Sequence, residues 1–494
     1  MCRVHINKRP LGIPQRITGS QIGRKSMKKR IVSIMLTAVM AVSLAGCGST
    51  QAAGSSAAGS SAAGSAAEST VAAASTTAAA EAASTTAAPV ADVAGEDDHT
   101  LSVYAWDANF NIPALKAAEA DYQKNVDPEF KLNIVEQSQS SDIENAITLA
   151  ASSGDYSTLA DIVLFQDHWF KKFATDYPDA WQNVNDADVD WSDFGEEKLS
   201  YSTLDGVHYG FPVDNGTVIC AYRTDILEQA GYTIDDLTGV TWDKFIEIGK
   251  DVYDKTGKYL LSMDGDGNDL PYMMLQAEGA SQFKDGKAYI SDNETMVKVI
   301  EVIQKMVENN VLYLANDWSD YTDQTIQGDM VAGVMNGNWI IPTIEQVTEN
   351  SGKWEITSMP TLSGEEGYAS NGGSSLYITS NCKKADLAKD FLAKTFGGST
   401  ATYDKALEDG GVITCCISAG KSDVYNQGVE YFNNQPIYAK IVEMGSHVKV
   451  VEQSDYHYTC REQVAAAIQN IIGGADIKSS LKDAEDQLTF EMGQ

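Results

Sequence analysis

The sequence predicts an α/β protein in which strands and helices alternate, and in which this alternation is repeated further along the chain. Three observations lead to this prediction. Short apolar runs of four to eight residues follow one another with amphipathic segments between them. The order from residue 101 to residue 165 is strand, helix, strand, helix, strand. A second pass of the same kind begins near residue 209.

The first pass is expected to form a parallel sheet flanked by helices. Its predicted strands are 101–106, 131–136 and 161–165, and its predicted helices are 112–124 and 142–152. The helix 112–124 follows from four apolar residues on one face, Ile112, Leu115, Ala118 and Tyr122.

The second pass combines more strands with longer helices. Its predicted strands are 217–222, 259–263, 331–335, 354–360 and 376–379, and a Gly-rich loop is expected at 363–375. Its predicted helices are 242–254, 296–311, 385–396, 459–472 and 477–488. The helix 296–311 rests on inward positions Met296, Ile300, Ile303 and Val307.

An export signal precedes these elements. Residues 27–47 begin with three cations, continue with an uncharged apolar run over 31–45 and end in small residues and Cys47. The run is shorter than the roughly 20 residues that a bilayer-spanning helix needs, which favours a cleaved signal over a permanent anchor. Residues 1–26 fit neither role and are expected to precede the true start at Met27.

The tetrapeptide Leu44-Ala45-Gly46-Cys47 resembles a bacterial lipobox. The resemblance implies a lipid on Cys47 and a mature protein that begins there, tethered to the outer face of a cytoplasmic membrane. An ordinary secretory signal with an incidental cysteine is the alternative. Residues 48–98, which are almost wholly Ala, Ser, Thr and Gly up to about residue 94, are expected to be a flexible tether, because they cannot bury a core.

The charge of the mature chain excludes several partners. The first 47 residues hold nine of the 36 Lys and Arg and none of the 69 Asp and Glu, so the remainder has a formal net charge of -42. Such a chain repels phosphate backbones and anionic headgroups, so neither nucleic acid nor direct lipid binding is expected. The five cysteines after Cys47, at 220, 382, 415, 416 and 460, match no zinc spacing and are interpreted as small buried hydrophobic residues.

Four segments together resemble extracellular solute-binding proteins of ABC importers, in the group that binds sugars and oligosaccharides. They are LAGC at 44–47, DGVHYGFPVDNGTVICAYRTDIL at 205–227, VMNGNWIIP at 334–342 and NGGSSLYITSNCKKADLAKDFLAKTF at 371–396. The resemblance implies the two-lobe, type II periplasmic-binding-protein-like fold, with a ligand cleft between lobes joined by hinge segments. The lobes are expected at 99–213 with 370–420 and at 214–369 with 421–494.

The same resemblance implies how the protein works. A monomeric, lipid-anchored protein on the outside of a Gram-positive cell would capture a sugar and deliver it to an ABC permease, without a cofactor. One hinge crossing is expected at the turn-rich break 214–216, and a second near 364–373, where glycines can absorb large backbone changes. A trap of this kind needs ligand contacts from both lobes.

Candidate ligand residues follow from the chemistry of sugars. Hydroxyl groups call for planar amides and carboxylates, and the apolar sugar faces call for aromatic rings. Residues of these types stand at strand ends and at the expected crossings: Trp106, Asp107, Gln166, Asp167, Asp214, Asn215, Asn338 and Trp339. Gly372 and Gly373 are candidates for their backbone N–H groups, and Tyr456, next to His457, is a candidate for lining the cleft. The alternatives are core packing for each Trp, turns or helix caps for each Asp or Asn, and hinge turns for the glycines.

Other chemistries find less support. Residues 264–269 (DGDGND) carry oxygen ligands at alternate positions but lack the glycine and glutamate of an EF-hand, so a turn before a helix is favoured over a calcium site and no metal is expected. The histidines have no metal-binding spacing, and no nucleophile motif appears. His457 is expected to be an ordinary, partly buried residue. A non-sugar solute, a lipid-anchored glycosidase and a surface adhesin remain as alternatives.

Overall fold

The computed structural model describes residues 97–264 and 269–494. The expectations for residues 1–26, the signal 27–47 with Cys47, nearly all of the tether 48–98, and the middle of 264–269 therefore lie outside the described residues. None of the described helices is long and apolar enough to span a bilayer.

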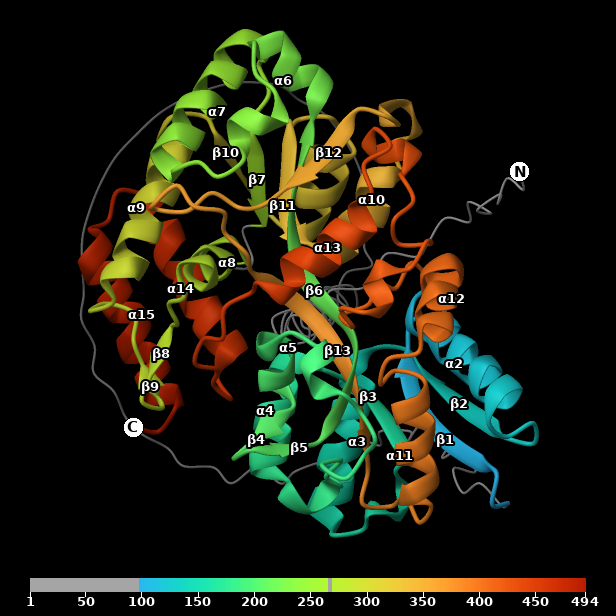
Figure 1. Cartoon of the computed structure of the whole chain (residues 1–494). Coiled ribbons are helices and arrows are strands. Elements are labelled where there is room, and N and C mark those ends of the chain that lie inside the picture. The colour runs from blue at the N-terminus through green and yellow to red at the C-terminus, as the bar shows by residue number, and fades with distance from the viewer. Residues whose placement is uncertain (1–96, 265–268) are drawn as a thin grey trace, which may run out of the picture. The chain divides into compact units, whose positions relative to one another are not determined.

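A seven-stranded mixed sheet connects the two halves of the protein (Figure 1). Its order is β11-β6-β13-β3-β1-β2, and β12 also pairs with β6. The strands are β1 (Thr100–Trp106), β2 (Lys131–Gln137), β3 (Ile162–Gln166), β6 (Gly210–Arg223), β11 (Gly333–Gly337), β12 (Trp354–Thr357) and β13 (Ser370–Ile378). The predicted parallel arrangement of the first pass is confirmed, because β1 pairs in parallel with both β2 and β3.

Strands β6 and β13 run antiparallel to each other and pass from one half to the other (Figure 1). The turn-rich break expected at 214–216 is wrong, because β6 is extended through all of its 14 residues. Gly216 serves close strand packing instead: a Cβ on it would lie 2.2 Å from the Asn371 carbonyl oxygen. The Gly-rich loop expected at 363–375 likewise gives way to β13 from Ser370 onward.

Helices cover this sheet on each side. They are α2 (Asn111–Asn125), α3 (Ser140–Ser153), α4 (Asp167–Asp176), α5 (Glu196–Tyr201), α6 (Thr224–Ala230), α7 (Trp242–Thr256), α8 (Asp269–Glu278), α9 (Glu294–Glu308), α10 (Ile341–Glu345), α11 (Ala385–Lys394), α12 (Thr400–Gly410), α13 (Ile437–Ser446), α14 (His457–Ile472) and α15 (Ile477–Glu491). Smaller sheets pair β10 (Leu312–Ala315) with β7 (Leu261–Asp264), β4 (Thr203–Leu204) with β5 (Val207–His208), and β8 (Phe283–Lys284) with β9 (Lys287–Ala288).

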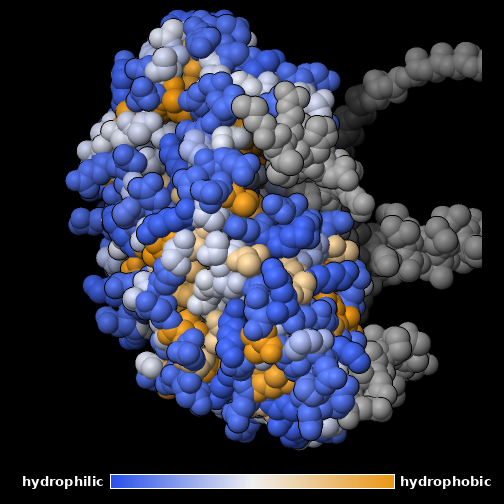
Figure 2. Space-filling view, turned by 45° about the vertical axis from the view of Figure 1, so that its right-hand side comes forward, coloured by the Kyte–Doolittle hydropathy of each residue, from blue (hydrophilic) through white to orange (hydrophobic). Residues whose placement is uncertain are grey.

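Buried apolar side chains form separate cores in the two halves. Two clusters fill the half that contains β1, β2, β3, α2, α3, α4, α11 and α12, which we call the first lobe. Two others fill the half with α6 to α10, β7, β10, β11 and α13 to α15, the second lobe. In Figure 1 the first lobe lies below and the second above, joined by β6 and β13. The face in Figure 2 is mainly hydrophilic, and its hydrophobic groups are small and scattered.

The five cysteines are buried and free, which confirms their interpretation as small hydrophobic residues. Burial raises the pKa of each thiol; that of Cys416, for example, rises to about 11. Helices α4, α12 and α13 were not predicted. Helix α4 matters most, because it places Asp167 and His168 in a first helical turn rather than in a loop.

Candidate functional site

The carboxyl ends of the first-lobe strands bring the predicted residues to one edge. Trp106 ends β1 and pairs in register with Gln137 at the end of β2. Gln166 ends β3 opposite Ser374 of β13, so the amino-terminal part of β13 reaches the same edge. Ligands of open α/β sheets bind beyond this edge.

The second lobe presents an aromatic pair in the equivalent place. β7 and β10 are parallel, and a parallel bridge between Tyr259 and Val331 gives the segment leading into β11 the same direction. Trp318 follows β10, Trp339 follows β11, and their rings lie 5.9 Å apart at 40°. Both side chains are half-buried. Trp318 was missed because the short strand LYLA before it was not recognised.

The crossing strands hold Trp339 and its neighbour through hydrogen bonds. The Trp339 indole donates to the Asn371 carbonyl oxygen at 2.6 Å, and the Asn338 amide donates to the Asn215 carbonyl oxygen at 2.7 Å. Gly372 has a φ of 99°, and a Cβ there would lie 3.2 Å from Trp339 Nε1. The predicted residues Asn215, Asn338, Trp339 and Gly372 are therefore brought together at the crossing.

A buried charge cluster lies next to this crossing. Lys198 of α5 lies 2.5 Å from Asp167 and donates to the Ser374 carbonyl oxygen at 2.8 Å. Ser375 donates to the other Asp167 oxygen at 3.0 Å. Asp214 accepts from the backbone and hydroxyl of Ser374. Burial raises the pKa of Asp167 to about 7, and the nearby carboxylates raise the pKa of Lys198.

These contacts indicate structural roles for the two aspartates. Their oxygens bind groups of α5 and β13, and a Cβ on Gly373 would lie 2.5 Å from Asp167 Oδ2. Gly373, with a φ of 100°, thus lets β13 pass close to the charge cluster. Ligand contact by Asp167, Asp214 or Gly373 stays an untested prediction.

A cluster of rings joins the two lobes between α4 and α14. His168 of α4 stacks on His457 of α14, with centroids 4.0 Å apart and an interplanar angle of 2°. Trp169 lies 4.8 Å from Tyr458 on the same two helices. Tyr201 and Tyr272 pack edge-on against His168 at 4.7 Å and 5.6 Å. We call these six residues the interlobe cluster.

His457 is therefore not the ordinary, partly buried residue that was expected. It is 2% exposed, His168 is 5% exposed, and burial lowers the pKa of His457 to about 3. The spacing of single histidines in the sequence carried no signal of this contact, because 289 positions separate the two residues.

Several buried polar atoms at this edge lack a hydrogen-bond partner among the described residues. They are Gln166 Oε1, both ring nitrogens of His168, Trp169 Nε1 and His457 Nε2. Each such atom costs about 1 to 3 kcal/mol unless something satisfies it. A polar ligand between the lobes would supply those partners.

Arg461 of α14 connects the interlobe cluster to the crossing. It donates to the Asn371 amide oxygen at 3.2 Å, pairs with Asp269, and its guanidinium lies 5.6 Å from the Tyr272 ring. Asp269 is the last residue of the run once considered for calcium, and its carboxylate is engaged with this cation. Among the described residues, no group of three His, Cys, Asp or Glu could hold a metal ion.

Three predicted residues have more local contacts. Trp106 is half-buried and packs against both first-lobe clusters. Asp107 has a φ of 65°, and its carbonyl oxygen accepts the backbone N–H groups that begin α2. Burial raises the pKa of its carboxyl. Tyr456 is half-buried against a second-lobe cluster. Their ligand roles stay predictions.

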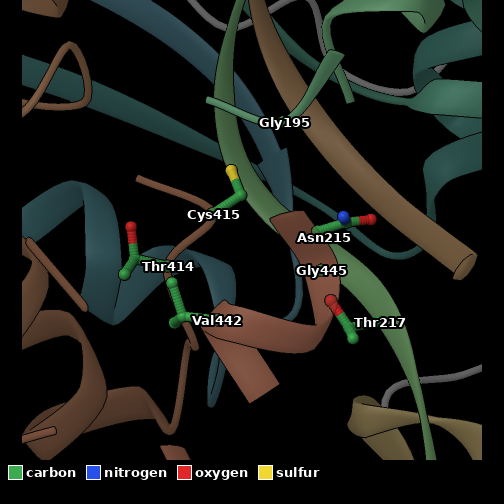
Figure 3. Close-up of a pocket in the computed structure, with 7 residues that line it drawn as sticks. All are labelled: Gly195, Asn215, Thr217, Thr414, Cys415, Val442 and Gly445. Carbon is green, nitrogen blue, oxygen red and sulfur yellow. The ribbon is translucent and has the colours of Figure 1, made fainter. Parts of the chain in front are cut away.

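A small cavity lies at the hinge, between β6, α13 and the loop after α12 (Figure 3). Its volume of about 10 Å³ is near the least that holds one water molecule, and it cannot admit a sugar. Its lining residues are Gly195, Asn215, Thr217, Thr414, Cys415, Val442 and Gly445. Asn215 lines this cavity and also accepts the hydrogen bond from Asn338, so the cavity borders the crossing strands without being a ligand site.

The fold and site define a two-lobe binding protein. The family model for bacterial extracellular solute-binding proteins matches residues 116–433, and the chain belongs to this family. The expected type II two-lobe fold is confirmed by its structural neighbours.

A lactose-binding protein of Rhizobium radiobacter is 31% identical over 400 residues, which cover 80% of this chain and 93% of that protein. The sugar-binding protein MalE of Xanthomonas citri superposes with a TM-score of 0.67 at 15% identity, covering 80% of this chain and 97% of that one. A binding protein of B. animalis subsp. lactis in complex with beta-1,6-galactobiose gives 0.61 at 20% identity, covering 80% and 98%.

Proposed function

We propose that the protein captures a sugar or short oligosaccharide outside the cell and delivers it to an ABC permease. The observation that carries this proposal is the chemistry between the lobes, where Trp169 of the first lobe and Tyr458, Trp318 and Trp339 of the second accompany buried polar atoms without partners. Rings suit the apolar faces of a sugar, and the polar atoms suit its hydroxyl groups. Relatives named for lactose, arabinooligosaccharide and maltodextrin binding support a sugar over another solute.

The proposal divides the site residues into two groups. Trp106, Trp318 and Trp339 serve as platforms, and Gln166, Trp169, His168 and His457 supply polar contacts, aided by Asp107 and Tyr456. Asp167, Asp214, Asn215, Asn338, Gly372 and Gly373 set the geometry of the crossing strands, because their described contacts are with the protein itself.

Binding would drive closure of the lobes about β6 and β13. A ligand shifts such an equilibrium only through contacts that exist in the closed state. The polar groups of α4 and α14 come from different lobes, so a sugar that satisfies both stabilises the closed arrangement. The protein itself performs no reaction in this scheme.

Titration calorimetry on the soluble chain from about residue 96 tests the proposal. Lactose is measured first, followed by arabino-oligosaccharides and maltodextrins, with peptides and polyamines as non-sugar controls. We expect dissociation constants of micromolar order or tighter for at least one saccharide, with no product released on long incubation. Heat from the non-sugar probes alone would refute the sugar assignment, and product release would favour the glycosidase alternative.

We also propose that Cys47 carries a lipid that holds the monomeric protein at the outer face of a Gram-positive membrane. Tethering would keep the loaded protein at a high effective concentration near its permease. Cys47→Ser should leave sugar affinity unchanged, release the protein into the medium and reduce uptake. Retention of the variant on the membrane would refute the anchor.

A further inference from the structure

The stacked histidines connect the two lobes without any charge partner. His168 belongs to α4 of the first lobe and His457 is the first residue of α14 of the second. Their rings are parallel at 4.0 Å, and both ring nitrogens of His168 and Nε2 of His457 lack hydrogen-bond partners. Parallel rings do not aim their in-plane lone pairs at a common point, so the pair has no geometry for holding a metal ion.

The surroundings of the pair disfavour a positive charge. Burial lowers the pKa of His168, and the charges of His457, Arg461 of α14 and Lys198 of α5 lower it further. Of the nearby carboxylates, Asp167 pairs with Lys198. Glu197 accepts hydrogen bonds from Ser370 and Gln276 through Oε1, while its Oε2 lacks a hydrogen-bond partner among the described residues. Tyr201, Tyr272 and Tyr458 present aromatic rings from α5, α8 and α14. Among the described ion pairs, neither imidazole has a carboxylate partner.

We propose that the lobes close only when both imidazoles are neutral, so that acid opens the protein and releases its ligand. The release of a sugar ligand rests on the proposed function, whereas the proton-dependent opening of the lobes does not. In the closed arrangement each ring covers the other, and an imidazolium would face a second one or the two cations. In an open arrangement the rings separate and meet water.

The size of the effect follows from linkage. Separated imidazoles titrate near pH 6.5, whereas the closed pair stays neutral well below that value. Ligand binding closes the lobes and so releases protons. The affinity for the ligand is therefore highest above about pH 7 and falls as pH drops through 6.5. For two such groups, the ratio of closed to open ligand-free protein should fall about 100-fold between pH 7.5 and pH 5.5. With the closed form predominating at pH 7.5, the dissociation constant then rises about 10-fold, with close to two protons released per ligand bound at pH 5.5.

The test compares the pH dependence of affinity in the wild-type protein with that in His168→Phe/His457→Phe, which keeps two rings but cannot titrate. Each protein is referred to its own affinity at pH 7.5, because both histidines are also proposed ligand contacts. Lactose is the probe, or the first saccharide of the panel that binds. We expect the dissociation constant to rise about 10-fold in wild type and less than about 3-fold in the variant over the same range. The matched control is His99→Phe, since His99 lies at the surface and pairs with Asp127; it should keep the wild-type pH dependence.

Other groups titrate in this pH range, so the proposal is tested by the difference between the wild-type and double-variant pH profiles rather than by the wild-type profile alone. Burial raises the pKa of Asp167 and of Glu144 to about 7. If the double variant keeps the wild-type pH dependence, or if wild type shows none, the proposal is overturned. If the double variant does not fold, His457→Gln alone should reduce the change to about 2-fold, and an unchanged curve would overturn the proposal equally.

A ligand-free measurement separates this inference from the proposed function. Small-angle scattering should show the radius of gyration of wild type rising on acidification to pH 5.5, while the double variant stays constant. If no saccharide binds but this difference appears, the sugar assignment fails and the proton-dependent closure stands. If wild type keeps its radius of gyration, the closure proposal fails even where sugar binds.

Discussion

Replacing Lys198 by Met should destabilise the protein strongly. The Lys198 ammonium is fully buried, lies 2.5 Å from Asp167 Oδ2 and also donates to the Ser374 carbonyl oxygen. Its removal leaves the buried carboxylates of Asp167 and Asp214 without their cation, beside the strand that crosses between the lobes. Breaking a buried pair on one side costs about 3 to 5 kcal/mol, so we expect a loss of that order at pH 8.

A second substitution, at Asp167, tests whether the unpaired carboxylate causes the loss of stability. Asp167→Asn in the Lys198→Met background removes the nearer of the two uncompensated charges, leaves that of Asp214, and retains an oxygen that Ser375 can donate to. The double variant should recover to within about 2 kcal/mol of wild type, because a neutral pair of similar volume avoids the cost of burying charge. Lys172→Met is the matched control, since its ion pair with Asp176 is exposed and worth less than about 1 kcal/mol.

The pH dependence of the stability lost in Lys198→Met tests the same explanation independently. Burial already raises the pKa of Asp167 to about 7, and loss of the ammonium raises it further. Protonation then removes the unpaired charge, so the deficit of Lys198→Met should shrink between pH 8 and pH 5. Guanidinium unfolding followed by circular dichroism measures all four proteins at both pH values. A deficit below 1 kcal/mol at pH 8, or no recovery with Asp167→Asn, would refute the reasoning.

Three further predictions concern the crossing, a buried carboxyl and the aromatic pair. Gly373→Ala should lower the free energy of unfolding by at least about 2 kcal/mol more than Gly474→Ala, as measured by chemical denaturation. Both glycines have φ near 100°, but only the methyl group at position 373 meets another atom, Asp167 Oδ2 at 2.5 Å. Equal losses in the two variants would contradict this. Burial raises the pKa of Glu144 to about 7, so the stability of wild type should fall by up to about 3 kcal/mol as pH rises from 4.5 to 7.5. The stability of Glu144→Gln should fall less, and parallel pH profiles of the two proteins would contradict this prediction. Trp339→Ala and Trp318→Ala should each weaken sugar binding by about 1 to 3 kcal/mol in calorimetry while thermal unfolding stays cooperative, and loss of folding would assign the rings to the core.

The sequence predicted the strands of the first lobe well because local periodicity determines them. The strands at 101–106 and 131–136 and the helix between them match β1, β2 and α2 within one residue at every end. The apolar residues in these segments are consecutive or regularly spaced, so no distant contact is needed to recognise them. The same reasoning placed Trp106 and Gln166 at strand ends, where the structure has them.

The crossing strands were predicted wrongly because glycine occurs both in turns and where two strands pack closely. Asp214-Asn215-Gly216 has the composition of a turn, and Gly372-Gly373 that of a hinge loop. The structure places both segments in strands: residues 214–216 are extended within β6, whereas Gly372 and Gly373 have positive φ at an irregularity of β13. The missing Cβ of Gly216 allows the Asn371 backbone to approach. Composition cannot distinguish a glycine that turns from one that packs, because the neighbour that decides is more than 150 positions away.

The polar residues of the site were predicted by type but not by partner. Asp167 and Gln166 are adjacent in sequence, yet Asp167 forms a buried ion pair with Lys198 whereas Gln166 Oε1 has no partner. The difference arises because Asp167 begins α4 and faces α5 and β13. Histidines 168 and 457 carried no motif at all, and only the docking of α14 against α4 makes them neighbours. Residues that face the opposite lobe belong to an arrangement that exists only when the lobes meet, so a strand-by-strand interpretation finds the edge of the cleft and misses the contacts that close it.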